Sequence, residues 1–164
     1  MKQFLPLLLI VPAIVLALLS LPYDVVGEDY VQVDYVEVQE IDAATSRLML
    51  SSGAESLTMV ISQSQGESID MGFMGLHGSR PNTHDLQAGM LEASGVAVLA
   101  VTIDELAEGY YTATIYLKNF VFTKGVDCRP SDCVAIAART GAPVYVKQQL
   151  FDVVAEEPEE VIPA

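Results

Sequence analysis

Basic residues and cysteines are scarce in this sequence, and each scarcity excludes a class of protein. The 164 residues include 8 lysines and arginines against 22 acidic residues, which gives a formal net charge of −14. A field of that sign repels polyanions, so a generally basic nucleic-acid binder is excluded. The 2 cysteines are too few for a disulfide-dense small domain. Glycine-rich phosphate loops and the H-E-x-x-H and G-x-S-x-G motifs are also absent, so nucleotide hydrolases, zinc proteases and esterases lack support.

Apolar residues are plentiful by contrast. They make up 51% of the chain, a content that excludes intrinsic disorder, and the length fits one domain of ordinary size. Most of the cations lie in residues 80–147, so an anionic ligand would bind in that part of the chain. The acidic tail, residues 156–164, is predicted to be a solvated terminus.

The N-terminal segment, residues 1–23, is predicted to be a transmembrane anchor or an export signal. The run from Phe4 to Leu21 carries no charge and follows Lys2. As a helix, its roughly 18 residues would span about 27 Å, close to the thickness of a bilayer core. No A-x-A cleavage site is visible near its end, which favours an anchor through residues 4–21 with the domain outside the cytoplasm. The alternative is a cleaved signal peptide and an exported protein.

The remaining chain predicts an α+β fold: a twisted, largely antiparallel sheet with packed helices, preceded by the hydrophobic N-terminal helix. After a linker at 24–30, a strand is expected over 31–38 with a bulge or break near Tyr35. Further strands are expected at 47–50, 56–62, 96–103, 110–117 and 144–146, and 120–123 extends or pairs with the strand at 110–117. A weak helix is expected at 66–75. A second helix is expected to begin at a Thr83 cap and end at Gly95, and a third runs from Pro130 to about Arg139. Because the strands and helices do not alternate as βαβ units, helices packed on one sheet are expected.

Two predicted helix starts carry the candidate chemistry. The first reads Arg80-Pro81-Asn82-Thr83-His84-Asp85, and the second reads Asp127-Cys128-Arg129-Pro130-Ser131-Asp132. Free backbone N–H groups at a helix start attract anions, and an adjacent guanidinium can grip a phosphate with two hydrogen bonds. A histidine titrates near neutrality, and the three aspartates, if they met, could hold one divalent cation and activate water. The alternative is that the same residues serve as helix caps and salt bridges.

These two motifs also resemble those of the bifunctional nuclease domain family. The resemblance rests on Arg80–Leu86 and Val126–Arg139, continues through Ala142–Val146, and covers roughly residues 31–155. It implies an α+β fold and nuclease activity on RNA and DNA, with nucleic acid as the partner. On this basis the candidate catalytic residues are His84, Asp85 and Asp132. The candidate substrate-binding residues are Arg80, Thr83, Arg129 and Ser131, and the candidate ligands of a divalent metal (Mg²⁺ or Mn²⁺) are Asp85 and Asp127.

The sequence departs from the family pattern at three places. Gln65-Gly66 stands where the family usually has a Glu-Ala pair, so catalysis would lack that carboxylate. Cys128 and Cys133 replace small residues, and they form either a disulfide that holds the Arg129 loop or two small buried side chains. The hydrophobic N-terminal segment is an addition, because members of the family are commonly soluble.

Two hypotheses of different class follow. In the first, the protein is a membrane-tethered or exported nuclease. In the second, it is a non-catalytic ligand-binding or protein-interaction module that keeps both helix starts for structure. An open cleft lined by His84, Asp85, Arg129 and Asp132 would favour the first, and burial of their polar atoms in mutual hydrogen bonds would favour the second. Strand edges could also pair two copies into a homo-oligomer.

Overall fold

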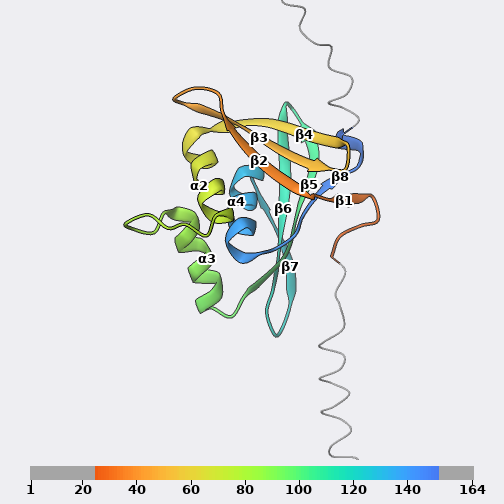
Figure 1. Cartoon of the computed structure of the whole chain (residues 1–164). Coiled ribbons are helices and arrows are strands. Elements are labelled where there is room, and N and C mark those ends of the chain that lie inside the picture. Colours follow the sequence, from red (N-terminus) through yellow and green to blue (C-terminus); the bar gives the residue numbers. More distant parts are fainter. Residues whose placement is uncertain (1–24, 152–164) are drawn as a thin grey trace, which may run out of the picture.

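A computed structural model describes residues 25–151 (Figure 1). The predicted N-terminal segment at 1–23 and the predicted acidic tail at 156–164 both lie outside these residues. Between residues 25 and 151, no helix is long and apolar enough to cross a membrane.

The larger of two sheets contains five strands in the order β1-β8-β5-β6-β7. Their bounds are Tyr30–Gln32 (β1), Val144–Lys147 (β8), Ala97–Ala107 (β5), Tyr110–Lys118 (β6) and Thr123–Cys128 (β7). All neighbours are antiparallel except β5 and β8, which run parallel. The smaller sheet is an antiparallel meander of β2 (Tyr35–Glu40), β3 (Thr45–Ser52) and β4 (Glu55–Ser62). The predicted α+β class with largely antiparallel pairing is therefore confirmed.

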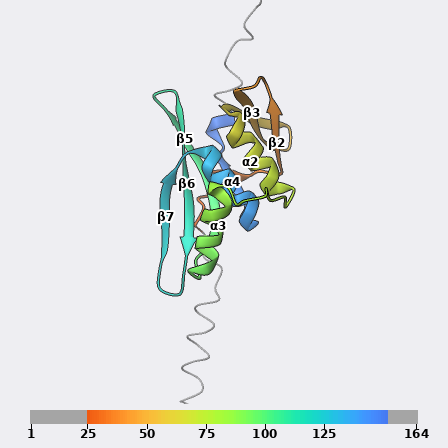
Figure 2. The ribbon, with the colours of Figure 1, turned by 90° about the vertical axis from the view of Figure 1, so that its left-hand side faces the viewer.

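Three helices lie between and beside the sheets: α2 (Gln63–Phe73), α3 (Thr83–Ala93) and α4 (Pro130–Thr140). Figure 2 shows β5, β6 and β7 on one side, α4 in the middle, and the small sheet with α2 on the other side. Helix α4 is buried from Pro130 to Ala137 except at Asp132, because its short apolar side chains let both layers approach closely. It ends at Gly141, whose φ of 72° is a conformation that suits glycine.

The core follows the alternation seen in the sequence. Leu48 and Leu50 of β3 and Leu57 of β4 are fully buried, as are Val101 and Ile103 of β5. In β6, Ala113 and Ile115 face the same core, while Thr112, Thr114 and Tyr116 alternate with them on the other face. These groups form one apolar cluster with α2 and α4, which fixes the helix starts relative to each other.

Of the two alternatives near Tyr35, the structure has the break, because β1 pairs with β8 in one sheet and β2 pairs with β3 in the other. Two local predictions were wrong. Helix α3 is capped by Asn82, and Thr83 is its first helical residue. The residues Phe120 to Phe122 belong to the loop between β6 and β7, and only Thr123 lies in a strand.

Gly72 marks a close approach between α2 and α4. A Cβ atom there would lie 2.8 Å from Ala138 Cβ and 2.8 Å from Arg139 Nη1. We expect Gly72→Ala to lower the free energy of unfolding by about 1 kcal/mol, because overpacking of roughly 1–3 kcal/mol exceeds the gain in helix propensity. The matched control is Gly89→Ala in α3, where a Cβ atom meets nothing within 4 Å. This control should stabilise by about 0.5–1 kcal/mol in urea denaturation. Equal shifts in both variants would contradict the packing argument.

Candidate functional site

The two helix starts are built differently. At α3, Asn82 and Asp85 form a reciprocal cap: Asp85 N–H donates to Asn82 Oδ1 at 2.9 Å, and Asn82 N–H donates to Asp85 Oδ2 at 2.9 Å. At α4, Arg129 is the N-cap residue and makes no side-chain cap bond, and Pro130 occupies the first turn. The start of α4 therefore leaves its polar side chains free for other contacts, whereas Asp85 is committed to the cap.

A buried ion pair holds the three helices together. Arg139 Nε donates to Asp85 Oδ1 at 2.6 Å, and the two side chains are only 5% and 7% exposed. The same guanidinium donates from Nη1 to the backbone oxygens of Ser68 and Ala135 at 2.9 and 2.8 Å. Hydrogen bonds from Asn82 N–H and Arg139 hold the pKa of Asp85 below its usual range. Asp85 is therefore a buried structural anion that joins α3 to α4 and α2.

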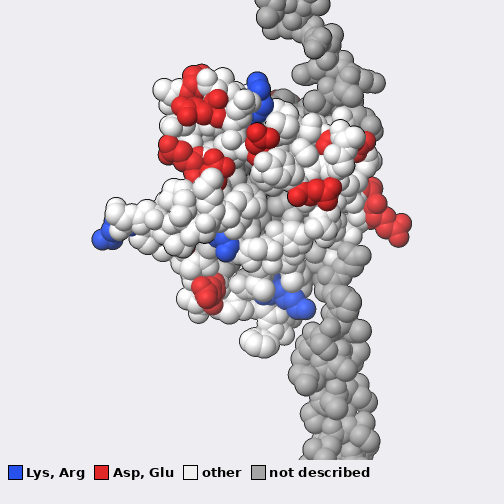
Figure 3. Space-filling view, in the orientation of Figure 1, with Lys and Arg blue, Asp and Glu red and all other residues white. Residues whose placement is uncertain are grey.

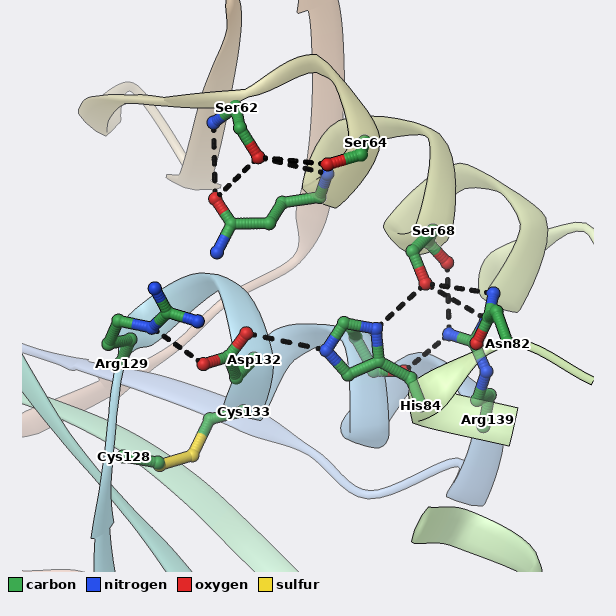
Figure 4. Close-up of polar contacts among 12 residues, drawn as sticks. Ser62, Ser64, Ser68, Asn82, His84, Cys128, Arg129, Asp132, Cys133 and Arg139 are labelled. Carbon is green, nitrogen blue, oxygen red and sulfur yellow. Dashed lines mark hydrogen bonds and ion pairs between the residues drawn. A yellow bond between two sulfur atoms is a disulfide. The ribbon is translucent and has the colours of Figure 1, made fainter. Parts of the chain in front are cut away.

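The hydrogen-bond partners of Ser68 determine the tautomer of His84 (Figure 4). The Ser68 hydroxyl accepts from Arg139 Nη2 at 3.1 Å and from Asn82 Nδ2 at 3.2 Å. Its own proton then points to His84 Nδ1, which lies 2.8 Å away. A neutral His84 accepts at Nδ1 and carries its proton on Nε2. The nitrogen nearer the surface is therefore a hydrogen-bond donor.

That donor faces the second helix start. His84 Nε2 lies 3.4 Å from Asp132 Oδ1, and Arg129 Nε donates to Asp132 Oδ2 at 2.7 Å. Burial raises the pKa of the Asp132 carboxyl, but the hydrogen bond and charge of Arg129, with a further bond from His84, outweigh it and hold the pKa below its usual range. Asp132 is thus an anion at neutral pH, with a donor on each side. Its side chain is 26% exposed and that of Arg129 is 73% exposed, so both can meet a ligand.

These side chains line an open cleft of about 470 Å³ between α2 and the two helix starts. Helix α2 contributes Gln65, Glu67 and Ser68 to its wall, and the complete lining is Ser64, Gln65, Glu67, Ser68, Met71, Asn82, Thr83, His84, Arg129 and Asp132. A second cleft of about 510 Å³ lies beside α3 and contains Asp85 and Arg139 instead. The cleft between α2 and the helix starts is the candidate site.

The structure divides the predicted site residues. It brings Thr83, His84, Arg129 and Asp132 into the cleft. These residues come from two helix starts, and the paired residues His84 and Asp132 are 48 positions apart in the sequence. It places the others elsewhere: Asp85 is buried in the ion pair with Arg139, Ser131 is buried, and Arg80 and Asp127 are exposed outside the cleft lining.

The residues do not fit a ready-made metal centre. Both oxygens of Asp85 accept hydrogen bonds, and Asp127 lies opposite Thr114 in the register of β6 and β7. Among residues 25–151, no three His, Cys, Asp or Glu side chains cluster closely enough to hold a metal ion. The predicted metal ligands Asp85 and Asp127 are therefore not brought together.

A disulfide joins Cys128 to Cys133 across the junction of β7 and α4. It encloses Arg129 and Asp132, and Cys133 is fully buried. Of the two alternatives for these cysteines, the structure has the bonded one. Since the bond ties the end of a strand to the first turn of a helix, it restrains the loop that carries Arg129.

Sequence reasoning missed several residues of this region. Ser68 lies inside a helix that contains no recognised motif, so no local signal was available for it. Asn82 is as good a cap as Thr83 and has an acidic residue three positions later, which is a cap signature that the sequence does contain. Glu67 also lines the cleft, and it accepts from Gln63 Nε2 at 2.8 Å.

The Asp85 ion pair predicts a pH dependence of stability. Because the pKa of Asp85 is lower in the folded protein than its ordinary value of 3.8, its contribution is complete above about pH 4 and is lost as the pH falls through the folded value. We expect the wild type to lose stability steeply below pH 4. The Asp85→Asn variant should begin less stable and lose less, measured by urea denaturation from pH 6 to pH 2. Parallel curves would show that other carboxylates cause the acid sensitivity.

Comparison with known proteins agrees with these observations. The sequence model of the bifunctional nuclease domain matches residues 48–159, a span that contains both helix starts and the cleft. Two relatives are the uncharacterized proteins MT1877 and Rv1829 of Mycobacterium tuberculosis strains CDC 1551 / Oshkosh and ATCC 25618 / H37Rv. Each is 37% identical over 102 residues, and the match covers 62% of this chain and 60% of the relative. The chain belongs to the bifunctional nuclease domain family.

Proposed function

We propose that this domain hydrolyses phosphodiester bonds of RNA or DNA in the cleft between α2 and the starts of α3 and α4. The observation that carries the proposal is the meeting of His84, Asp132 and Arg129 in that cleft. A proton acceptor, a hydrogen-bond donor that orients it and an exposed cation are the groups that such a reaction requires. Membership of the bifunctional nuclease domain family supports the same reaction class.

In the proposed reaction, Arg129 holds the phosphate. Its Nε is bonded to Asp132, and the rest of its exposed guanidinium can donate to two phosphate oxygens. Asp132 takes a proton from a water molecule as the water oxygen bonds to phosphorus. The bond from phosphorus to the leaving oxygen breaks, that oxygen takes a proton from solvent, and Asp132 returns its proton to solvent. His84 donates to Asp132 from Nε2 and keeps the carboxylate in position.

Because an acidic protein surface repels nucleic acid, the proposed nuclease activity requires a local contact between the substrate and a cation in the cleft. Within the described part of the chain, Arg129 is the only lysine or arginine that lines the cleft, so the cleft has one phosphate-holding group and little long-range attraction. We therefore expect weak binding of long duplexes and a preference for single strands, whose backbone can bend into a cleft of this size.

A hydrolysis assay on the purified full chain tests the proposal. Labelled single-stranded RNA and DNA would be incubated with Mg²⁺, Mn²⁺ or EDTA, which also tests the predicted divalent metal. Arg129→Ala should reduce cleavage about tenfold or more, since a guanidinium bond to phosphate is a charge-assisted pair. Arg47→Ala is the matched control, because Arg47 lies on β3 and donates to Gln39 outside the cleft. Absence of cleavage in every condition would sink the proposal.

One observation favours the second candidate, a binding module without catalysis. Gln65 lines the cleft where the family resemblance implies a glutamate, and an amide cannot accept a proton as a carboxylate can. Its side chain instead caps α2: Gln65 Oε1 accepts from Ser62 N–H at 3.1 Å, and Ser62 Oγ accepts from Gln65 N–H at 3.3 Å.

Gln65→Glu separates the two candidates. Glutamate serves equally well at this position of the cap, so the variant should fold normally. If the missing carboxylate limits the reaction, cleavage should rise about tenfold or more. Gln87→Glu, on the exposed part of α3, adds the same charge outside the cleft lining and should leave cleavage unchanged. Tight binding of RNA by a Gln65→Glu variant that still cuts nothing would favour the module.

A further inference from the structure

The loop between β6 and β7 carries three consecutive apolar side chains into solvent. Phe120 is 94% exposed, Val121 is 87% exposed and Phe122 is 54% exposed. In both ribbon views the hairpin projects beyond the helices at the same end of the molecule (Figures 1 and 2). Single exposed apolar residues are normal on a protein surface, but a contiguous group at a projecting tip marks an interaction site.

The backbone of this loop is already hydrogen-bonded within the loop. Val121 N–H and Phe122 N–H both donate to Asn119 Oδ1, at 2.8 and 3.0 Å, and Asn119 N–H donates to Phe122 O at 3.1 Å. A segment can leave water at low cost only when its backbone N–H groups have such partners. The tip can therefore enter an apolar medium without breaking its turn.

Lysines flank the tip on both strands. Lys118 ends β6 and Lys124 follows Thr123 in β7, and the pairs Lys118–Thr123 and Leu117–Lys124 place the two lysines next to the tip on opposite faces of the hairpin. In Figure 3 most of the acidic side chains on this face lie toward the opposite end, one acidic group lies near the end that carries the tip, and a cationic group lies next to the uncharged tip. In a chain of net charge −14, two cations beside an apolar tip give this end a local character that the rest of the surface lacks.

We propose that the β6–β7 tip inserts into the headgroup region of an anionic lipid bilayer, with Phe120, Val121 and Phe122 among the acyl chains and Lys118 and Lys124 at the phosphates. Apolar and aromatic side chains next to lysines are the combination that binds membrane interfaces. The apolar run at 4–21, predicted from sequence as an anchor or signal, would place the domain at such a surface. The proposal is independent of nuclease activity.

Insertion can be measured in the full chain. Val121→Cys would be labelled with an environment-sensitive fluorophore and the protein reconstituted in vesicles of phosphatidylcholine mixed with phosphatidylglycerol. Ala54→Cys is the matched control, because Ala54 is exposed in the β3–β4 turn and has no positive φ. We expect blue-shifted emission and quenching by spin-labelled lipid at position 121 only. A label at position 54 reports tethering without insertion, so equal signals at both positions would overturn the proposal.

Two sets of variants test whether the lysines and the phenylalanines cause insertion, and single-stranded RNA is tested as another ligand. Lys118→Gln/Lys124→Gln should lower the ratio of inserted to free tip about fivefold for each lysine lost, the factor for a cation near an anionic surface. The double variant Phe120→Ser/Phe122→Ser should remove the emission shift of the label at position 121. Circular dichroism would check that this variant is folded. Insertion that is equal in pure phosphatidylcholine, or a label at position 121 that responds to single-stranded RNA and not to vesicles, would contradict the assignment.

Discussion

Asp132→Asn is expected to lower the rate of phosphodiester cleavage by about 100-fold or more, the usual effect of removing a proton acceptor. Asparagine keeps the shape of the side chain, and its single oxygen can still accept from Arg129 Nε, although its amide NH2 group cannot accept from His84 Nε2. Because Arg129 stays in place, binding of the phosphate should change little. The loss should therefore appear in kcat rather than in KM. Single-turnover cleavage of labelled RNA at saturating enzyme measures this directly.

Asp127→Asn is the control for that experiment. Asp127 is an exposed carboxylate on β7, five residues before Asp132, and lies outside the cleft lining. It should retain cleavage within about twofold of wild type. If instead Asp127→Asn is as inactive as Asp132→Asn, the predicted metal-ligand role of Asp127 gains support and the assignment of Asp132 as the lone acceptor is wrong.

Arg139→Met is expected to destabilise the fold by about 3 kcal/mol or more. It removes the partner of Asp85 and leaves that carboxylate buried without a compensating charge, which is costlier than losing a surface pair. The backbone oxygens of Ser68 and Ala135 lose a donor as well. The free energy of unfolding from urea denaturation measures the loss, and a marginally stable domain would unfold outright.

Arg129→Met provides a comparison on the same helix. Its pair with Asp132 involves a guanidinium that is 73% exposed, so its loss should cost less than about 1 kcal/mol. In addition, Asp85→Asn/Arg139→Met should lose less than the sum of its two single variants, because each removes the partner of the other. Equal losses in Arg139→Met and Arg129→Met would show that burial does not decide the energetics of these pairs.

The elements predicted best were those with signals at both ends. Pro130 at the start and Gly141 at the end define α4, and alternation from Tyr110 to Leu117 defines β6 and its buried face. Each of these signals acts between neighbours in the chain, through a restricted φ, a missing N–H or the pleat of a strand. Where two neighbours offered the same chemistry, as Asn82 and Thr83 did for the cap of α3, local reasoning chose wrongly.

The site was predicted only in part, because local signals place a residue at a helix start but do not determine which way its side chain faces. The motifs indicated that His84, Asp85, Arg129 and Asp132 belong to helix starts, but both Arg-Asp combinations look alike in sequence. In the fold the two aspartates lie in different environments: Asp85 faces inward to Arg139, and Asp132 faces the cleft beside Arg129. The structure therefore has the buried mutual hydrogen bonds expected of a scaffold at Asp85 and an open cleft lined by His84, Arg129 and Asp132, whose role in catalysis stays a prediction.

By itself, the sequence of this protein determined its family, its α+β class and the positions where α3 and α4 start. Those properties depend on residue types and on spacings of a few positions. Only the tertiary structure decided that Ser68 sets the tautomer of His84, that the disulfide forms, and that Gln65 and Asp132 face the same cleft. The disulfide depends on how β7 meets α4, and the other contacts join separate helices that pack on one shared core. No local pattern encodes how separate elements are turned toward one another.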